Sequence, residues 1–174
     1  MSSEKEWLDN TTLSYIIGFA MICIVVWMIV KQMKEYYLTD DPMLQKLKDS
    51  FEKFFGQQTY WTGELQSLNN INPMKNISLY KGKQSYTINK EQVHMCLKDE
   101  KGAYYPFNML VYVLAHEMAH VICPNIGHTP EFHAIFDQLL EEMAQFPIDE
   151  KGTKIYDPNA EIIMDYCEYA AGEE

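Results

Sequence analysis

The spacing of hydrophobic residues changes along this chain, and each spacing predicts a different element. Residues 10–30 carry no charge, and residues 15–30 are almost wholly apolar. About 20 such residues in a helix cover roughly 30 Å, the thickness of the hydrocarbon core of a bilayer. A buried helix of a soluble domain is the alternative, but it would keep a polar stripe that this segment lacks. We therefore predict a transmembrane helix over residues 13–30, after an N-terminal tail over residues 1–12.

The segments after the span show helical spacing and then an irregular stretch. Residues 31–41 are expected to form a juxtamembrane linker, and a helix is predicted from Pro42 until Gly56 ends it. The next stretch, residues 57–76, is rich in Asn, Gly and Pro, which predicts a loop with a short helix. The apolar positions of the predicted helix share one face and are Met43, Leu44, Leu47, Phe51, Phe54 and Phe55.

The period of the hydrophobic pattern falls to two between residues 77 and 98. Residues 77–80, 84–88 and 92–98 alternate between apolar and polar side chains, with short polar segments between them. This alternation predicts three strands joined by tight turns. A further strand is predicted in the tail, over residues 161–169.

Two helices are predicted between these strands and the tail. Residues 108–123 are apolar on nearly all sides, which is typical of a helix buried in a core, and Pro124 ends it. The second helix has Thr129 as its N-cap and Pro130 as its first residue. The order predicts an α+β fold with one core over residues 42–174, containing a short antiparallel or mixed sheet.

Charge narrows the range of partners. The net charge is −11, and all 14 basic residues are lysines. Arginine is the usual bidentate reader of phosphate and guanine, and an acidic chain repels a polyanion, so nucleic acid is disfavoured as a partner. The expected partners are a lipid bilayer, through residues 13–30, and a protein or peptide.

Lysines also predict the orientation of the span. Lys31 and Lys34 follow it directly, whereas Lys5 alone precedes it, which favours a C-terminal domain in the cytoplasm or facing a virion interior. The segment before the apolar run is acidic and no small-residue cleavage site follows it, so the span is expected to be retained as a single-pass anchor. Glycosylation of the acceptor-like Asn76 would require the opposite topology.

The four cysteines are interpreted as reduced thiols. One of them lies in the apolar run and the other three are far apart, which is unlike a disulfide framework. Cys123 is close enough in sequence to two histidines to be weighed as a metal ligand.

The strongest chemical signal is LAHEMAH at residues 114–120, which contains His116, Glu117 and His120 on the predicted core helix. Residues four apart share one helical face, so both imidazoles can reach one metal ion. Glu117 is rotated by about 100 degrees from His116, where it can accept a proton from a metal-bound water. Two satisfied core histidines are the alternative interpretation.

A third ligand is predicted just beyond this helix. The chain turns at Gly127 directly into His128, which can return toward the two helical histidines. Three protein ligands and one open position are typical of a catalytic zinc site. The alternatives are a capping role for His128 and a carboxylate ligand, Glu131 or Asp137. The remaining histidines are interpreted as ordinary positions of a strand and a helix, and are His94 and His133.

Residues 108–140, NMLVYVLAHEMAHVICPNIGHTPEFHAIFDQLL, resemble the zinc metallopeptidases of the WLM and SprT-like group, which are zincins. The chain is also similar, over residues 77–169, to a membrane-anchored branch associated with large DNA viruses. The resemblance implies a zinc ion held by the three histidines of the motif and the turn, with Glu117 as general base. The chain departs from this group in lacking the basic segments of relatives that cleave proteins crosslinked to DNA.

The resemblance implies hydrolysis of peptide bonds through a zinc-bound water that Glu117 activates. It also implies that an extended substrate pairs with the strand before the active helix, roughly Val93 to Lys98. The alternative function is a membrane-anchored scaffold, for example of a virion, that keeps the zincin fold with little or no catalysis. Candidates for stabilising the oxyanion are Tyr104, Tyr105, Tyr156 and Tyr166.

Overall fold

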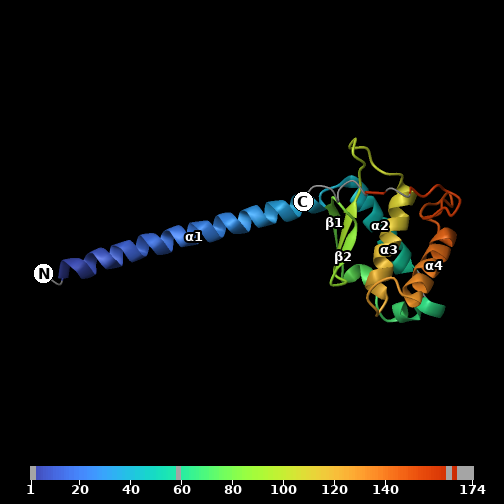
Figure 1. Ribbon diagram of the computed structural model, residues 1–174, viewed down its shortest axis with the longest axis horizontal. Helices are drawn as coiled ribbons and strands as arrows, with labels where there is room; N and C mark the ends of the chain where they lie inside the picture. The colour runs from blue at the N-terminus through green and yellow to red at the C-terminus, as the bar shows by residue number, and fades with distance from the viewer. Residues whose placement is uncertain (1–2, 58–59, 164–165, 168–174) are drawn as a thin grey trace. The chain divides into compact units, whose positions relative to one another are not determined.

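The computed structural model describes residues 3–57, 60–163 and 166–167 (Figure 1). The chain divides into two compact units, Met1–Leu38 and Thr39–Glu174. The described residues of the first unit all belong to helix α1, Ser3–Thr39, whose last residue falls in the second unit. The second unit contains all the strands and the remaining helices of the described residues.

Helix α1 contains the predicted span. Its segment Thr12–Met33 is long and apolar enough to cross a membrane, and none of it is buried inside protein. Large side chains such as Phe19 and Trp27 are 70% and 63% exposed. The same helix continues through residues 31–39, so the expected linker is helical over most of its length rather than irregular.

The second unit begins with the predicted amphipathic helix. Helix α2, Pro42–Gln57, buries one apolar face, and Asp41 caps it by accepting hydrogen bonds from the backbone of Met43 and Leu44. The helix runs through Gly56 instead of ending there. Two short 3₁₀ helices follow in the stretch predicted as a loop, and are η1, Gly63–Asn69, and η2, Pro73–Lys75.

The sheet is small and mixed. Its strands are β1, Ser78–Gly82, β2, Tyr86–Ile88, and β3, Gln92–Cys96, in the order β1-β3-β2. β1 pairs with β3 in parallel and β2 pairs with β3 antiparallel. Strand β3 is therefore the central strand, and the expectation that it offers an edge to a substrate is wrong, because β1 and β2 occupy its two sides. The edge strands are β1 and β2.

The connections in the sheet differ from the predicted pair of tight turns. The β2–β3 connection is a tight hairpin with Asn89 and Lys90 in the left-handed region, at φ 50° and 59°. The β1–β2 connection instead passes over the end of β3, because β1 and β2 lie on opposite sides of it. The connection turns tightly where it leaves β1: a Cβ on Gly82 would lie 3.0 Å from the carbonyl oxygen of Gln84.

Two helices complete the core, as predicted. Helix α3, Phe107–Ile122, lies between the sheet and helix α4, Pro130–Gln145, in Figure 1. Helix α3 is apolar on most sides because it packs against both neighbours. Its buried residues are Met109, Leu110, Val111, Val113, Leu114, Ala115, Glu117, Met118 and Ala119.

The tail departs from the prediction in two ways. No strand forms at residues 161–163 or 166–167, and the other positions of the expected strand lie outside the described residues. Cys167 forms a disulfide with Cys96, the last residue of β3, across 71 positions of sequence. The expectation of four reduced thiols is therefore wrong, because folding brings together two cysteines that are far apart in sequence. The free cysteines are Cys23 and Cys123.

Candidate metal centre

Helix α3 places His116 and His120 side by side. The residues are one helical turn apart, and their ring centroids are 5.0 Å apart. Both imidazoles are partly buried, whereas Glu117, turned toward the sheet, is only 5% exposed. The helix thus carries two imidazoles on one face and a buried carboxylate beside them, as the sequence predicted.

A short loop after α3 returns a third imidazole to the pair. The loop is anchored where it leaves the helix, because the Lys90 ammonium of the β2–β3 hairpin donates to the carbonyl oxygens of Cys123 and Pro124. Gly127 then adopts φ +84°, a conformation that glycine takes without strain. The chain turns there, and the Nε2 atom of His128 lies 3.0 Å from the Nε2 atom of His116.

The N-terminus of α4 fixes the far side of this loop. The Thr129 hydroxyl accepts a hydrogen bond from the backbone N–H of Phe132 at 3.2 Å, which confirms the predicted N-cap, and Pro130 is the first helical residue. The amide of Asn125 donates to the carboxylate of Glu131 across the loop. His128 is therefore held between two anchored ends.

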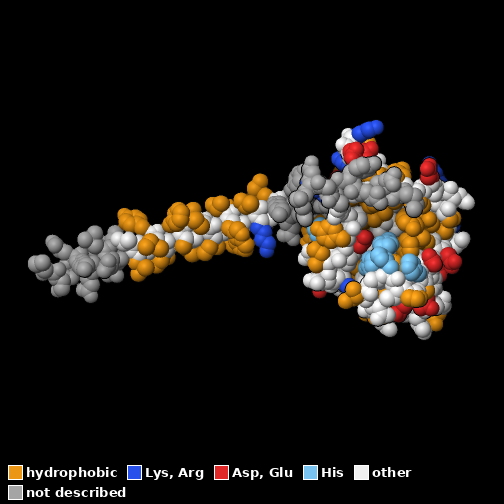
Figure 2. Space-filling model, in the orientation of Figure 1, with side chains coloured by type: hydrophobic (Ala, Val, Ile, Leu, Met, Phe, Trp, Pro, Cys, Tyr) orange, Lys and Arg blue, Asp and Glu red, His pale blue; other side chains and the backbone are white. Residues whose placement is uncertain are grey.

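The donor set fits a tetrahedral metal ion. One ligand atom from each of His116, His120 and His128 lies within 4.8 Å of the other two. Tetrahedral zinc with Zn–N distances of about 2.0–2.1 Å requires nitrogen atoms about 3.3 Å apart, so small side-chain adjustments would suffice. In Figure 2 the histidines form one patch on the surface of the second unit, so the ion and its fourth ligand could enter from solvent.

The two imidazoles of helix α3 are held in the form that a metal needs. Burial, followed by the three neighbouring histidines, lowers the pKa of His116 to about 4. Burial also lowers the pKa of His120, with smaller contributions from His128 and Lys90. Neutral imidazoles keep a lone pair for coordination at neutral pH.

A single aromatic side chain supports all three imidazoles. The ring of Phe132, the third residue of α4, lies 5.0 Å from the His116 ring, 4.4 Å from the His120 ring and 4.8 Å from the His128 ring between centroids. Phe132 is fully buried, so it limits the rotamers of the imidazoles from beneath. The helical spacing after Pro130 indicates only that Phe132 shares an apolar face, and nothing in that spacing indicates which rings it touches.

The other candidate ligands lie apart from this group. Glu131 is bound by Asn125, and Asp137 is exposed in the middle of α4. Cys123 is fully buried at the end of α3. None of these residues, nor His133, joins the group that could hold a metal ion among the described residues. His94 stacks between Tyr80 and Tyr86 across the sheet, as an ordinary strand position.

Glu117 is oriented by the edge strand β2. The Thr87 hydroxyl lies 2.7 Å from Oε2 of Glu117 and donates to it. Burial raises the pKa of Glu117, and the hydrogen bond from Thr87 opposes this with a smaller lowering. The carboxyl is thereby fixed in direction and made more basic than an exposed glutamate. Nothing in the sequence indicates this role of Thr87, which lies 30 positions before Glu117 and belongs to no motif.

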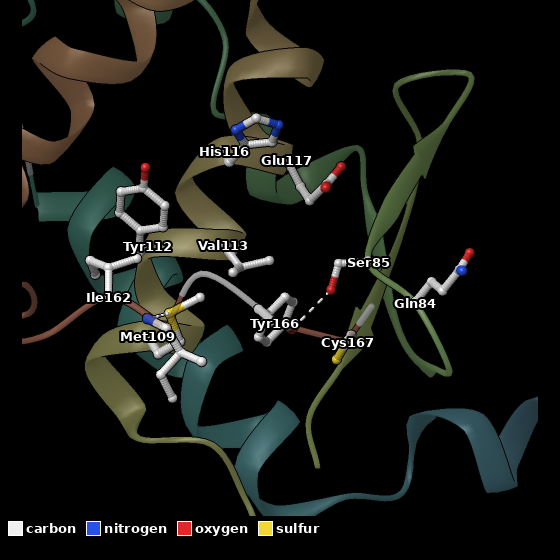
Figure 3. Close-up of a pocket in the computed structure, with 11 residues that line it drawn as sticks. Gln84, Ser85, Met109, Tyr112, Val113, His116, Glu117, Ile162, Tyr166 and Cys167 are labelled. Atoms are coloured by element: carbon white, nitrogen blue, oxygen red, sulfur yellow. Dashed lines mark hydrogen bonds between the residues drawn. The ribbon is translucent and has the colours of Figure 1, made fainter. Parts of the chain in front are cut away.

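An open cavity of about 810 Å³ extends from these groups. In Figure 3, His116 and Glu117 lie at one end and Tyr166 lies at the other, beside Ser85 and Cys167. The walls between the ends are mainly apolar. The residues of these walls include Met109, Tyr112, Val113, Ile162 and Ile163.

The four tyrosines proposed for an oxyanion role bond elsewhere or pack away. Tyr104 donates to Asp41 at the start of α2, and the Tyr105 hydroxyl accepts from the backbone of Cys167. Tyr156 is buried, with its ring centroid 6.4 Å from that of Tyr112. Tyr166 lines the cavity but donates to a carbonyl of β3. The structure therefore gives no support to a direct oxyanion role for these residues.

Comparison with known proteins finds viral relatives. The chain is 40% identical over 110 residues to "Uncharacterized protein 136R" of Invertebrate iridescent virus 6, which covers 62% of this chain and 58% of that protein. It is 36% identical over 106 residues to "Uncharacterized protein 042R" of Invertebrate iridescent virus 3, covering 60% and 62%. It is 33% identical over 102 residues to "Uncharacterized protein R325" of Acanthamoeba polyphaga mimivirus, covering 55% and 49%.

Each match covers only part of the relative. The chain spans about half to three fifths of the length of the curated relatives it matches. No protein-family model matches the chain. No solved structure matches it.

Proposed function

We propose that this protein is a membrane-anchored zinc endopeptidase, similar to the zincins of the WLM and SprT-like group. The observation that carries the proposal is the convergence of three imidazoles beside a buried, oriented carboxylate. A structural zinc site would use a fourth protein ligand, and no fourth side chain joins the three histidines within the described part of the chain.

His116, His120 and His128 would hold the ion. Zinc bound there would supply a Lewis acid that polarises the scissile carbonyl and makes water a better nucleophile at neutral pH. The remaining chemistry belongs to the protein's own groups.

Glu117 is assigned the role of general base. Because Thr87 donates to Oε2, the other carboxylate oxygen, Oε1, is the atom that accepts a proton from the attacking water. The raised pKa favours acceptance of that proton, because a more basic carboxylate binds it more strongly. The protonated carboxyl then passes the proton to the leaving amine. Burial of Glu117 between α3 and β2 keeps the carboxylate in one orientation throughout.

The substrate is proposed to be an extended peptide bound along β2. Among the described strands β2 pairs only with β3, so its outer backbone groups are available to a peptide. Thr87 lies on this strand and donates to Glu117, so this edge lies next to the carboxylate to which we assign the role of general base. The apolar cavity beside Glu117 would receive one side chain of the peptide.

The site is proposed to face a virion interior. The lysines after the span favour the cytoplasmic side, whereas a disulfide is typical of proteins kept away from cytosolic reductants. A particle that has left the cytosol satisfies both observations, and the relatives are viral proteins. Asn76 is exposed, so its glycosylation in expressing cells would contradict this orientation.

The test uses the full-length chain in detergent. We expect about one equivalent of bound zinc and cleavage of an unfolded protein substrate. Glu117→Gln should keep the zinc and lower kcat about 10²- to 10⁴-fold, because it removes the proton acceptor without removing a ligand. Glu141→Gln, an exposed position on α4, is the matched control and should keep kcat within about twofold.

Two outcomes would contradict the proposal. Equal cleavage by the wild type and Glu117→Gln would sink the assigned mechanism. Bound zinc with no cleavage by the wild type would favour the alternative of a membrane-anchored scaffold that retains the metal.

A further inference from the structure

We propose that Tyr166 determines which substrate side chain the cavity accepts, and that the Cys96–Cys167 disulfide holds Tyr166 in place. The inference rests on the proposed peptidase function, because it concerns the cavity beside Glu117. Tyr166 and Cys167 line that cavity at the end away from the histidines (Figure 3).

A closed ring of hydrogen bonds fixes the Tyr166 hydroxyl. The backbone N–H of Cys96 donates to the Ser85 hydroxyl at 3.0 Å, and the Tyr166 hydroxyl donates to the carbonyl oxygen of Cys96. The single proton of Tyr166 is thereby used, so in the 2.9 Å contact between the two hydroxyls Ser85 is the donor. Both backbone groups of Cys96 are satisfied through this ring.

This ring depends on how the sheet ends. Strand β2 begins at Tyr86, opposite His94, so no backbone partner from β2 lies opposite Cys96. Ser85 lies in the connection that crosses the end of β3, and its hydroxyl takes the partner's place. Tyr166 therefore docks onto an edge that the strand order leaves open.

The neighbouring disulfide fixes the backbone of the same segment. Cys167 is bonded to Cys96, so one residue of β3 holds Tyr166 by its carbonyl oxygen and Cys167 by its sulfur. The backbone N–H of Cys167 also donates to the Tyr105 hydroxyl at 3.3 Å, and the Tyr105 ring lies 4.8 Å from the Tyr166 ring. The position of Tyr166 is thus set by covalent, polar and aromatic contacts.

We expect the cavity to select among substrate side chains by their polarity and by their size. Met109 and Val113, four residues apart on one face of α3, form one apolar wall, and Ile162 and Ile163 add to it. Such walls favour an apolar side chain. The fixed Tyr166 ring limits how deep that side chain can reach, so the wild type should prefer a leucine side chain to a tryptophan.

Reduction should loosen this limit. A dithiol reductant converts the disulfide to the thiols of Cys96 and Cys167 and is itself oxidised to a disulfide, which balances the exchange. Tyr166 would then keep its hydrogen bonds but lose the covalent tether beside it. Larger side chains should gain access, so substrate preference would depend on the redox state of the protein.

The experiment measures the affinity of two peptide hydroxamates, one with a leucine and one with a tryptophan side chain, for the zinc-loaded full-length chain in detergent. Tyr166→Ala should raise the tryptophan-to-leucine affinity ratio about tenfold or more, the scale expected for pocket-size changes. Tyr166→Phe keeps the ring and should change the ratio less than about threefold, since only hydrogen bonds are lost.

Two further arms test the disulfide in protein that keeps Tyr166. Reduction of the wild type, and the double variant Cys96→Ser/Cys167→Ser, should raise the ratio in the same direction as Tyr166→Ala. Cys23→Ser, a cysteine of α1 outside the disulfide, is the matched control and should leave the ratio unchanged. Thiol labelling after denaturation should count two thiols before reduction and four after it.

The results separate this inference from the proposed function. A ratio unmoved by Tyr166→Ala, or by reduction, would overturn the role of the residue or of the disulfide. Binding of both hydroxamates without cleavage of any substrate would refute the peptidase but still test Tyr166 through the ratio. If neither hydroxamate binds the zinc-loaded wild type, both proposals fail.

Discussion

The two ends of the cavity are built in opposite ways. The end with the candidate metal site, here called the metal end, takes its three histidines and its glutamate from residues 116–128. These residues lie on one helix and the loop that follows it. The Tyr166 end brings together Ser85, Cys96 and Tyr166, which are separated by up to 81 positions of sequence. The first end is nearly local, whereas the second exists only when the sheet, α3 and the tail are assembled.

This difference indicates which perturbations each end should tolerate. Local spacing brings two imidazoles together as soon as α3 forms, so the metal end depends mainly on its ligands and on the aromatic ring beneath them. The Tyr166 end depends on a disulfide crosslink and on long-range hydrogen bonds.

Loss of a histidine ligand on helix α3 should abolish metal binding at the metal end. In His120→Ala only two imidazoles remain, so we expect zinc content to fall below about one tenth of an equivalent and cleavage to be lost. Elemental analysis of the dialysed full-length chain measures this. His94→Ala, on the outer face of the sheet, is the control, and full zinc retention by His120→Ala would refute the ligand assignment.

Removal of the supporting ring should destabilise both the core and the metal end. Phe132→Ala deletes a fully buried ring, which costs about 3–5 kcal/mol of unfolding free energy. Denaturant unfolding measures this loss. Zinc affinity should also fall, because the three imidazoles would gain rotamers. A variant with unchanged zinc affinity would show that Phe132 packs against the histidines without positioning them.

Loss of the disulfide should destabilise the Tyr166 end without lowering the zinc content. In Cys96→Ser/Cys167→Ser we expect a loss of about 2–4 kcal/mol, since the crosslink closes a long loop. Zinc content should stay near one equivalent, as measured on the same samples. Loss of zinc in this variant would contradict the independence of the two ends.

Thr87→Val should weaken catalysis without removing the metal. The valine keeps the shape of threonine but cannot donate to Glu117, so kcat should fall about 10- to 100-fold, the range for groups that orient a metal site. KM should change little. Thr87→Ser restores the hydroxyl and should recover most of kcat, whereas an equally inactive serine variant would point to a packing role.

The smallest expected effect is the pH dependence of the stability of the metal-free protein. The pKa of His116 is lowered to about 4 by burial and the other histidines, so between pH 6.5 and 4 the unfolded chain binds more protons than the folded one. Stability should therefore fall as the pH drops through that window. Thermal unfolding from pH 7 to 5 measures it. The background should be Glu117→Gln, because the raised pKa of Glu117 acts in the opposite direction.

The sequence predicted the helices and the clustering of the three histidines, for an identifiable reason. Apolar spacing at 3.6 residues placed α2 and α4, and an apolar run that ends at Pro124 placed α3. The turn residues Gly127, Thr129 and Pro130 act in the structure as their chemistry requires. The convergence of His116, His120 and His128 follows from one helix and one turn. Interactions over short separations can be read from a sequence because few backbone conformations are open to them.

The sequence predicted the sheet and the tail poorly. Alternation located three strands but does not encode their order, so β3 was expected at an edge and lies in the centre. Sequence separation misled the interpretation of Cys96 and Cys167, which the fold brings into a disulfide. Thr87 was missed because only the pairing of β2 with β3 places it beside Glu117.

The sequence by itself determined the apolar segment of α1, the amphipathic and buried helices, and the three imidazoles with their adjacent carboxylate. These depend on periodicity and on turn chemistry within about a dozen residues. Only the tertiary structure decided which strand offers a free edge, which residue orients Glu117 and what closes the far end of the cavity. Those depend on contacts between distant segments, whose geometry is fixed by packing the whole core rather than by any local pattern.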